Sequence, residues 1–473
     1  MPHYNVASPK AQEFIDDAEI RQTMAYALEN ANNIPLQRDI LAKGQLAKGL
    51  DHREAAVLLV ASQPDIRQAT MQLANDIKLR FYGKRIVLFA PLYLSNHCVN
   101  GCLYCPYHAS NRTIPRHQLT QEQIRQEVTA LQAMGHKRLA LEMGEDPTHN
   151  TMDYLLDAIH TIYSTRYRHG AIRRVNINVA ATTVENYARM HQAGIGTYIL
   201  FQETYHQAHY QALHPNGPKS HYAYHTEAMD RAMQGGIDDV GLGVLFGLNT
   251  YLYDFIGLLM HAEHLEACYG VGPHTLSVPR ICPADGISLG DFPNAVPDDV
   301  FLHLIATARV AVPYTGIIVS TREKASVRTK ALHVGVSQVS GGSKTTVGGY
   351  ADTTDARNSA QFEVHDERTL DQVVAWLLDN GHIPSFCTAC YRQGRTGDRF
   401  MALCKSGKIS DCCSPNALLT LQEYIQDYAS DSTRQKALAT MRYELALLPN
   451  EAVKARTRAW MDRIVQGERD FRF

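Results

Sequence analysis

An alternation of short apolar runs with amphipathic segments begins at Arg85 and constrains the fold of this 473-residue chain more than any other feature. Runs of this length are typical of buried parallel strands, and apolar residues at three- and four-residue spacing between them indicate helices. The runs are Arg85–Leu94, Arg138–Met143, Val175–Ala180, Thr197–Gln202, Asp239–Leu245, Thr275–Val278, Gly316–Ser320 and Val334–Val339. The helical patterns are Thr120–Met134, Thr151–Ser164, Thr183–Ala193, His221–Gln234, Tyr251–Cys268, Pro297–Ala311, Glu323–Leu332 and Thr369–Asn380.

Strand–helix pairs in such a series predict an α/β fold with a closed (β/α)8 barrel, whose active site lies at the C-terminal ends of the strands. An open doubly wound sheet is the alternative. No Gly-x-Gly-x-x-Gly turn follows any of the runs, which weakens a nucleotide-binding form of that alternative. Thr120 with Gln123 predicts a capping box, and Gly135 and Gly194 stand where helices should end.

The barrel is flanked by two helical regions. We expect an N-terminal helical extension over 1–83, the barrel over 84–380 and a mostly helical C-terminal domain over 381–473. The first contains the patterns Ala11–Leu28, Leu36–Leu46, Asp51–Leu59 and Pro64–Tyr82, and the last contains Pro415–Tyr428 and Ser432–Glu468.

Composition limits the partners that the chain can have. The sequence is 45% hydrophobic and 20% charged, with a net charge of −2, so it presents no field for capturing nucleic acid or an anionic membrane. No apolar stretch approaches the ~18 residues of a membrane-spanning helix. Residues 1–16 lack the basic-then-apolar pattern of a signal peptide. We therefore expect a cytoplasmic protein without nucleic-acid or membrane partners.

Three cysteines, Cys98, Cys102 and Cys105, directly follow the first run and so belong to the predicted active-site face. A cubane iron–sulfur cluster needs four ligands, so three thiolates in one loop leave one iron open to an exchangeable ligand. Zinc is the alternative, with His97 or His108 as the fourth ligand.

A second cysteine group, Cys387, Cys390 and the pair Cys412–Cys413, follows the last helical pattern. In a reducing compartment, two such groups indicate metal rather than disulfides. The last helix should end at the bottom of the barrel, so we expect this group at the mouth opposite the first.

Polar residues at several strand ends suggest that the barrel lumen holds polar ligands, because charged groups are costly to bury unpaired. Among them are Glu203, Arg280 and Arg322. The remaining cysteines, Cys268, Cys282 and Cys404, are expected to be small buried apolar residues.

The Cys-x3-Cys-x2-Cys spacing, with the aromatic Tyr104 before the last cysteine, resembles the radical S-adenosyl-L-methionine (SAM) superfamily. The resemblance implies a 4Fe–4S cluster on the three cysteines, with SAM on its open iron. The stretch 142–145 is similar to the Gly-Gly-Glu motif of that family, with Met143 replacing the first glycine. It implies that Gly144 and Glu145 meet SAM, with Tyr104 near the adenine and Glu203 at the ribose.

Three further motifs, Phe201–Tyr205, Ser277–Arg280 and Ser320–Glu323, resemble the aromatic amino acid lyase branch, which includes tyrosine lyases. This resemblance implies cleavage of the Cα–Cβ bond of L-tyrosine to p-cresol and dehydroglycine. Arg322 and Ser320 would hold the substrate carboxylate. Arg280 could serve instead, or could support the charge of the cofactor. For either arginine, the alternative is a structural ion pair with Glu323 or Asp285.

The spacing Cys387-x2-Cys390-x22-Cys413, followed by a helical tail, resembles the tyrosine lyases that mature FeFe-hydrogenase. It implies an auxiliary 4Fe–4S cluster with a labile fifth iron, where dehydroglycine becomes CO and cyanide. The product would be an Fe(CO)2(CN) unit bound by free cysteine, for the hydrogenase H-cluster. Only the family spacing selects Cys413 over Cys412. A histidine also holds the extra iron, and His264 fits that pattern best, with His261 and His274 open.

Two other functions stay open at this point. A thiamine-pathway tyrosine lyase, or 2-iminoacetate synthase, would stop at dehydroglycine, and a zinc-dependent scaffold would never use SAM. The family resemblance further implies an electron donor such as ferredoxin or flavodoxin, and transient contacts with other hydrogenase maturation proteins.

Overall fold

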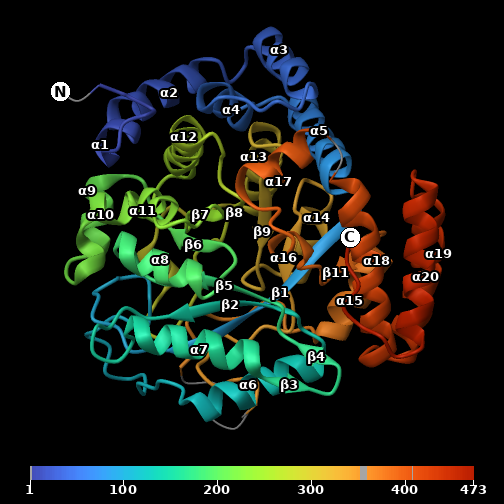
Figure 1. Ribbon diagram of the computed structural model, residues 1–473. Helices are drawn as coiled ribbons and strands as arrows, with labels where there is room; N and C mark the ends of the chain where they lie inside the picture. Colours follow the sequence, from blue (N-terminus) through green and yellow to red (C-terminus); the bar gives the residue numbers. More distant parts are fainter. Residues whose placement is uncertain (1–2, 352–358, 407–408) are drawn as a thin grey trace.

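The computed structural model describes residues 3–351, 359–406 and 409–473. Within these ranges, parallel strands close into a barrel in the order β1-β2-β5-β6-β7-β8-β9-β10, and β10 pairs back to β1 (Figure 1). The closure confirms the predicted (β/α)8 class and excludes an open sheet. The strands are β1 Arg85–Ser95, β2 Arg138–Met143, β5 Arg174–Asn178, β6 Tyr198–Phe201, β7 Val240–Gly243, β8 Thr275–Ser277, β9 Gly316–Val319 and β10 Gln338–Ser340.

Alternation along the strands separates an apolar core from the lumen. Leu88 and Leu139 are fully buried and belong to the main hydrophobic cluster. Their neighbours Phe89 and Ala140 line a cavity inside the barrel. Because successive side chains of a strand point to opposite faces, the core lies between strands and helices, while the lumen is left to other residues.

Helices return the chain on the outside of the barrel, and two of the predicted end signals are observed. The capping box of α6 forms, because Gln123 N donates to Thr120 Oγ1 (3.2 Å) and Thr120 N donates to Gln123 Oε1 (2.9 Å). Gly135 ends α6 with φ +102°. The helices are α6 Gln121–Met134, α7 Met152–Ser164, α8 Val184–Gln192, α9 Gln207–Leu213, α10 Tyr222–Thr226, α11 Ala228–Gln234, α12 Tyr251–Tyr269, α13 Asp298–Ala311, α14 Ala325–Leu332 and α15 Leu370–Asp379.

The N-terminal helices pack against the outside of the barrel (Figure 1). Helix α4 contacts α12 and α13, and α5 contacts α13. They are α1 Ala11–Phe14, α2 Asp17–Glu29, α3 Ile34–Gln45, α4 His52–Leu59 and α5 Pro64–Tyr82. Pro64 stands in the first turn of α5, where its missing N–H is tolerated.

The C-terminal part adds a strand that the sequence patterns did not predict. β11 (Ile383–Ser385) pairs in parallel with the start of β1. It is followed by α16 Ala389–Arg392, α17 Gly397–Lys405, α18 Ser410–Asp427, α19 Asp431–Ala446 and α20 Glu451–Val465. The predicted single helix Ser432–Glu468 is wrong, because the chain breaks at Pro449 and Asn450 caps α20. In the described part of the chain, no helix is both long and apolar enough to span a membrane.

Candidate active site and second cysteine site

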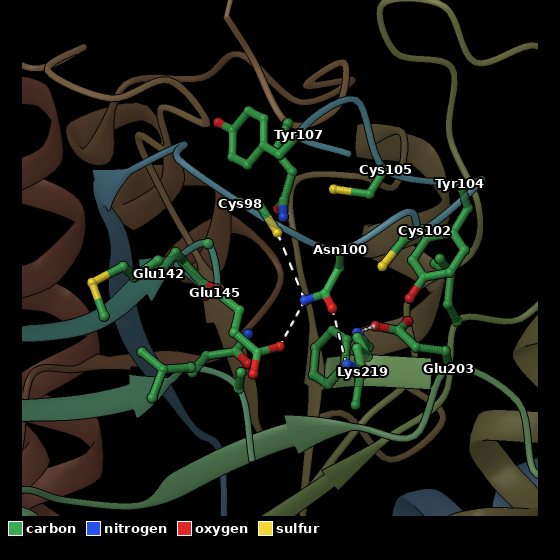
Figure 2. Close-up of a pocket in the computed structure, with 18 of the residues that line it drawn as sticks. Cys98, Asn100, Cys102, Tyr104, Cys105, Tyr107, Glu142, Glu145, Glu203 and Lys219 are labelled. Carbon is green, nitrogen blue, oxygen red and sulfur yellow. Dashed lines mark hydrogen bonds and ion pairs between the residues drawn. The ribbon is translucent and has the colours of Figure 1, made fainter. Parts of the chain in front are cut away.

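The loop after β1 brings the three cysteines of the first group to one cavity of about 150 Å³, here called the first cavity. Cys98, Cys102 and Cys105 line it together with residues from the C-terminal ends of the strands. The sulfur atoms are directed toward the same space (Figure 2). Three converging thiols at this face provide the donor set that the sequence predicts for a cluster.

A second loop, at residues 144–145, is held against the cysteine loop. Val99 N donates to Glu145 O (2.8 Å), and the Asn100 amide donates to Glu145 Oε2 (2.6 Å; Figure 2). A Cβ atom at Gly144 would lie 2.3 Å from the carbonyl oxygen of His97, so this approach requires glycine. The backbone of 144–145 therefore forms one wall of the first cavity.

Glu203, Lys219 and Tyr104 form the opposite wall. Lys219 Nζ donates to Glu203 Oε1 (2.7 Å), and Lys219 N donates to Asn100 Oδ1 (2.9 Å). Tyr104 Oη lies 2.7 Å from His214 Nε2. Each of these side chains lines the first cavity except His214. One oxygen of Glu203 is thus engaged by Lys219, and the carboxylate is held in place beside the cysteines.

Burial raises the pKa of the Cys102 thiol, and it raises the pKa of Cys105 to about 11. A thiol must lose its proton to bind metal, so metal binding at these cysteines would release protons. The three cysteines of the first cavity are therefore better suited to binding a metal than to remaining as free thiolates.

A second cavity, of about 90 Å³, continues from the first into the barrel and is here called the lumen cavity. Ser320 and Arg322 both line it, as the sequence predicts for groups that hold a substrate. The guanidinium of Arg322 stacks on the Phe362 ring at 3.5 Å. The residues shared by both cavities are Tyr93, Glu142, Asn178, Phe201, Arg322, Gln361 and Phe362.

The structure does not bring Arg280 to either cavity. Its Nε donates to Glu323 Oε1 (3.0 Å), and its Nη2 lies 2.9 Å from Asp298 Oδ1. The structural ion pair with Glu323 is therefore the correct alternative for Arg280, and the expectation that it binds substrate is wrong. Its guanidinium is satisfied by carboxylates outside the cavities.

Cys387, Cys390 and Cys413 line a third cavity of about 60 Å³, here called the lower cavity. Cys412 does not line it, and its sulfur instead lies 3.1 Å from Arg395 Nη1. Arg85 and Arg138, the first residues of β1 and β2, line the lower cavity too. The first cavity lies at the C-terminal ends of the strands, so the two cysteine groups occupy opposite mouths of the barrel.

His264, the preferred histidine of the sequence analysis, is not at the lower cavity. Its Nδ1 lies 2.7 Å from Val6 O and its Nε2 lies 2.9 Å from Asp230 Oδ1, so both nitrogens are engaged elsewhere. His261 is likewise bonded to the Tyr205 hydroxyl. His274 lines the lower cavity instead, which corrects the expectation. Burial lowers the pKa of His274 and keeps a neutral imidazole.

Sequence reasoning missed several charged groups that line these cavities. Lys219 lies in a short 3-10 helix, Pro218–Ser220, that contains no motif, so no local pattern pointed to it. Arg85 and Arg138 did carry a signal, because each begins a strand two residues before a position that faces the lumen. Glu142 lay inside the 142–145 motif but received no role.

Comparison with known proteins decides the family. The model of the Radical SAM superfamily matches residues 92–256, and that of the Biotin and Thiamin Synthesis associated domain matches residues 277–383. A crystal structure of HydG, a maturase of the FeFe-hydrogenase, superposes with a TM-score of 0.94 at 49% identity, covering 98% of this chain and 100% of that one. The chain belongs to the HydG family of radical SAM enzymes.

Other relatives extend this placement. HydG from Carboxydothermus hydrogenoformans superposes with a TM-score of 0.82 at 36% identity, covering 95% of this chain and 99% of that one. The 2-iminoacetate synthase of Salmonella typhimurium is 33% identical over 342 residues, which is 72% of this chain and 87% of that protein. Membership in the radical SAM superfamily implies SAM and a 4Fe–4S cluster, and the three converging thiols of the first cavity fit that cluster.

Proposed function

We propose that the protein is a radical SAM lyase that cleaves the Cα–Cβ bond of L-tyrosine to p-cresol and dehydroglycine. Dehydroglycine would then be converted to CO and cyanide at the lower cavity, to build an Fe(CO)2(CN) cysteine unit for the FeFe-hydrogenase H-cluster. The observation that carries the proposal is one barrel with a three-cysteine cavity at each mouth and a polar lumen between them. The similarity to HydG and to 2-iminoacetate synthases supports it.

At the first cavity, Cys98, Cys102 and Cys105 would hold the cluster. When bound, the cluster and SAM supply one-electron cleavage of the SAM sulfonium. The backbone at Gly144 and Glu145 would receive the amino group of SAM. Glu203, fixed by Lys219, would accept hydrogen bonds from the ribose, and Tyr104 would lie against the adenine.

In the lumen cavity, Arg322 and Ser320 would hold the carboxylate of tyrosine, with the two donors of the guanidinium fork giving a bidentate grip. Because the lumen is enclosed by the strands, it would shield a reactive imine from hydrolysis on its way to the lower cavity.

At the lower cavity, Cys387, Cys390 and Cys413 would hold an auxiliary 4Fe–4S cluster, and His274 the labile fifth iron. Arg85 and Arg138 support an anionic occupant. Both are 6% exposed, and in the described ranges neither has an acidic partner within 4.0 Å. Each donates one hydrogen bond to a backbone carbonyl, but two buried guanidiniums without a carboxylate are costly unless a negative group lies beside them.

Several wider assignments belong to the same proposal. They are free cysteine as the ligand of the product, ferredoxin or flavodoxin as electron donor, transient contact with other maturation proteins, and a cytoplasmic location. The division into a helical extension (1–83), barrel (84–380) and cluster-binding domain (381–473) is also proposed.

Anaerobic turnover with L-tyrosine, SAM and a reductant tests the function. We expect p-cresol together with CO, the latter trapped by haemoglobin. Cys387→Ser and Cys390→Ser should still form p-cresol but release at least about tenfold less CO, since only the lower cavity loses ligands. Formation of p-cresol without CO in the unaltered protein would indicate a 2-iminoacetate synthase instead. Stoichiometric zinc with little iron would overturn the radical SAM assignment of both sites.

A further inference from the structure

Two oppositely charged side chains, Glu142 and Arg322, face the junction of the first cavity and the lumen cavity. Glu142 belongs to β2 and Arg322 follows β9, with β1 and β10 between these strands in the closed sheet. In the described ranges, neither side chain forms an ion pair within 4.0 Å, with the other or with any third residue. The cavity thus presents separated positive and negative groups.

The charged groups nearby behave differently. Arg280 pairs with Glu323 and Asp298, and Lys219 pairs with Glu203. In the described part of the chain, Glu142 and Arg322 are the charged side chains that line the lumen cavity. Both are available to pair with a ligand. A ligand that pairs with both side chains must be a zwitterion, with an anionic group for Arg322 and a cationic group for Glu142 a few bonds apart.

The surroundings of Glu142 set the proton affinity of its carboxyl group. Burial raises its pKa to about 8, although the charge of Arg322 opposes this effect. Asn178 lines the same junction, and its side chain also favours the charged form of the Glu142 carboxyl group, which lowers its pKa. With a pKa of about 8, much of this carboxyl group is protonated at pH 7, and the carboxylate that forms as the pH approaches 8 is a stronger base than an ordinary glutamate.

We propose that Glu142 binds the α-ammonium group of the amino acid whose carboxylate Arg322 holds, and takes up a proton from it. The inference rests on the proposed function, in which that amino acid is L-tyrosine. In the transfer, an N–H bond breaks, an O–H bond forms on Glu142, and the electron pair stays on nitrogen. An ammonium nitrogen has no lone pair, so the neutral amine is the form that radical chemistry at nitrogen requires.

The test compares two ligands on two proteins. Binding of L-tyrosine and of 3-(4-hydroxyphenyl)propionate, which lacks the amino group, is measured by anaerobic calorimetry on the cluster-loaded protein with SAM and no reductant. The unaltered protein should bind L-tyrosine at least about tenfold more tightly than the analogue, as expected for a charge-assisted hydrogen bond. In Glu142→Gln this ratio should fall close to one.

A matched control is Glu323→Gln, which changes a buried carboxylate that pairs with Arg280 and lines neither cavity. The control should keep the ratio of the unaltered protein. Iron content and thermal melting verify that each variant is loaded and folded, and Glu142→Asp, which keeps the charge, should restore part of the ratio.

The pH dependence gives a second readout. Tyr93 and Tyr107, which face Glu142 from β1 and the cysteine loop, stay neutral because burial raises the pKa of each. Arg322 is the basic side chain whose charge acts on Glu142. The ratio should therefore rise between pH 6 and pH 8 in the unaltered protein and stay flat in Glu142→Gln.

The outcomes separate this inference from the function on which it rests. An unchanged ratio in Glu142→Gln, or an equal loss of affinity for both ligands, would overturn the role of Glu142 while leaving the lyase assignment intact. Failure of the unaltered protein to bind L-tyrosine would overturn both.

Discussion

Single residues decide how closely the two loops of the first cavity approach each other. Asn100 joins them through Glu145 and Lys219, and the absence of a side chain at Gly144 lets the backbone lie against His97. Both contacts are local in space but 45 or more residues apart in sequence. The cavity wall therefore depends on positions that no single motif contains.

Gly144→Ala should damage SAM binding more than folding. The added Cβ would lie 2.3 Å from a backbone oxygen, which cannot rotate away, so the loop that carries Glu145 must shift. Overpacking of this kind costs about 1–3 kcal/mol, which corresponds to about 5- to 150-fold in SAM affinity if the shift falls on this loop. Equilibrium dialysis with SAM measures it.

Gly272→Ala is the control for that substitution, because the nearest atom to its Cβ is 3.9 Å away. It should leave the affinity for SAM unchanged. Equal SAM affinity in Gly144→Ala and the unaltered protein would contradict the assignment of residues 144–145 to the SAM site.

At the scale of elements, a buried charge cluster joins the N-terminal helices to the barrel. His52, at the start of α4, lies 2.7 Å from Glu263 of α12 through Nδ1 and 3.0 Å from Glu19 of α2 through Nε2. Burial alone would lower the pKa of His52, but its hydrogen bonds and charge interactions with the two carboxylates raise it. The imidazolium form therefore links three helices.

This linkage predicts a pH-dependent stability. Because folding raises the pKa of His52, its contribution is complete below the ordinary value of about 6.5 and is lost as pH rises through the raised value. At pH 6, His52→Gln should lower the free energy of unfolding by about 1–3 kcal/mol, and the difference should shrink toward pH 9. Thermal melting across this range measures it.

His160→Gln, on the exposed surface of α7, serves as the control and should melt like the unaltered protein at every pH. If the loss of stability in His52→Gln stays constant from pH 6 to pH 9, the imidazole stabilises the fold through packing rather than through its charge.

At the scale of the whole molecule, the sequence predicts what depends on local order. Strand–helix alternation specifies the barrel, and the spacing of Cys98, Cys102 and Cys105 specifies a shared cavity, because each depends on neighbouring residues. The role of Arg280 could not be predicted, since it depends on Asp298 and Glu323, which the fold alone brings together. The preference for His264 as the iron ligand failed for the same reason, because its partner Asp230 comes from another helix.

The lumen itself is a property of the whole barrel. Val87 and Gln338 line the lower cavity, while Phe89 and Ser340, two residues further along β1 and β10, line the lumen cavity. The two cavities therefore occupy successive layers of one barrel interior. At Gly316, in β9, a Cβ atom would lie 2.7 Å from Gln338 Nε2, so the missing side chain leaves space beside this residue of the lower layer.

Gly316→Val should therefore separate the two halves of the proposed reaction. The branched side chain would crowd the lower layer of the barrel interior beside Gln338, so p-cresol should form at a rate within about twofold of the unaltered protein while CO falls by at least about tenfold. Dehydroglycine that cannot pass would hydrolyse to glyoxylate and ammonia, so glyoxylate should rise as CO falls. Parallel assays of the three products test this, with Gly290→Val, outside the barrel, as control. Undiminished CO with unchanged glyoxylate would contradict a route for the intermediate past Gln338 in the lower layer.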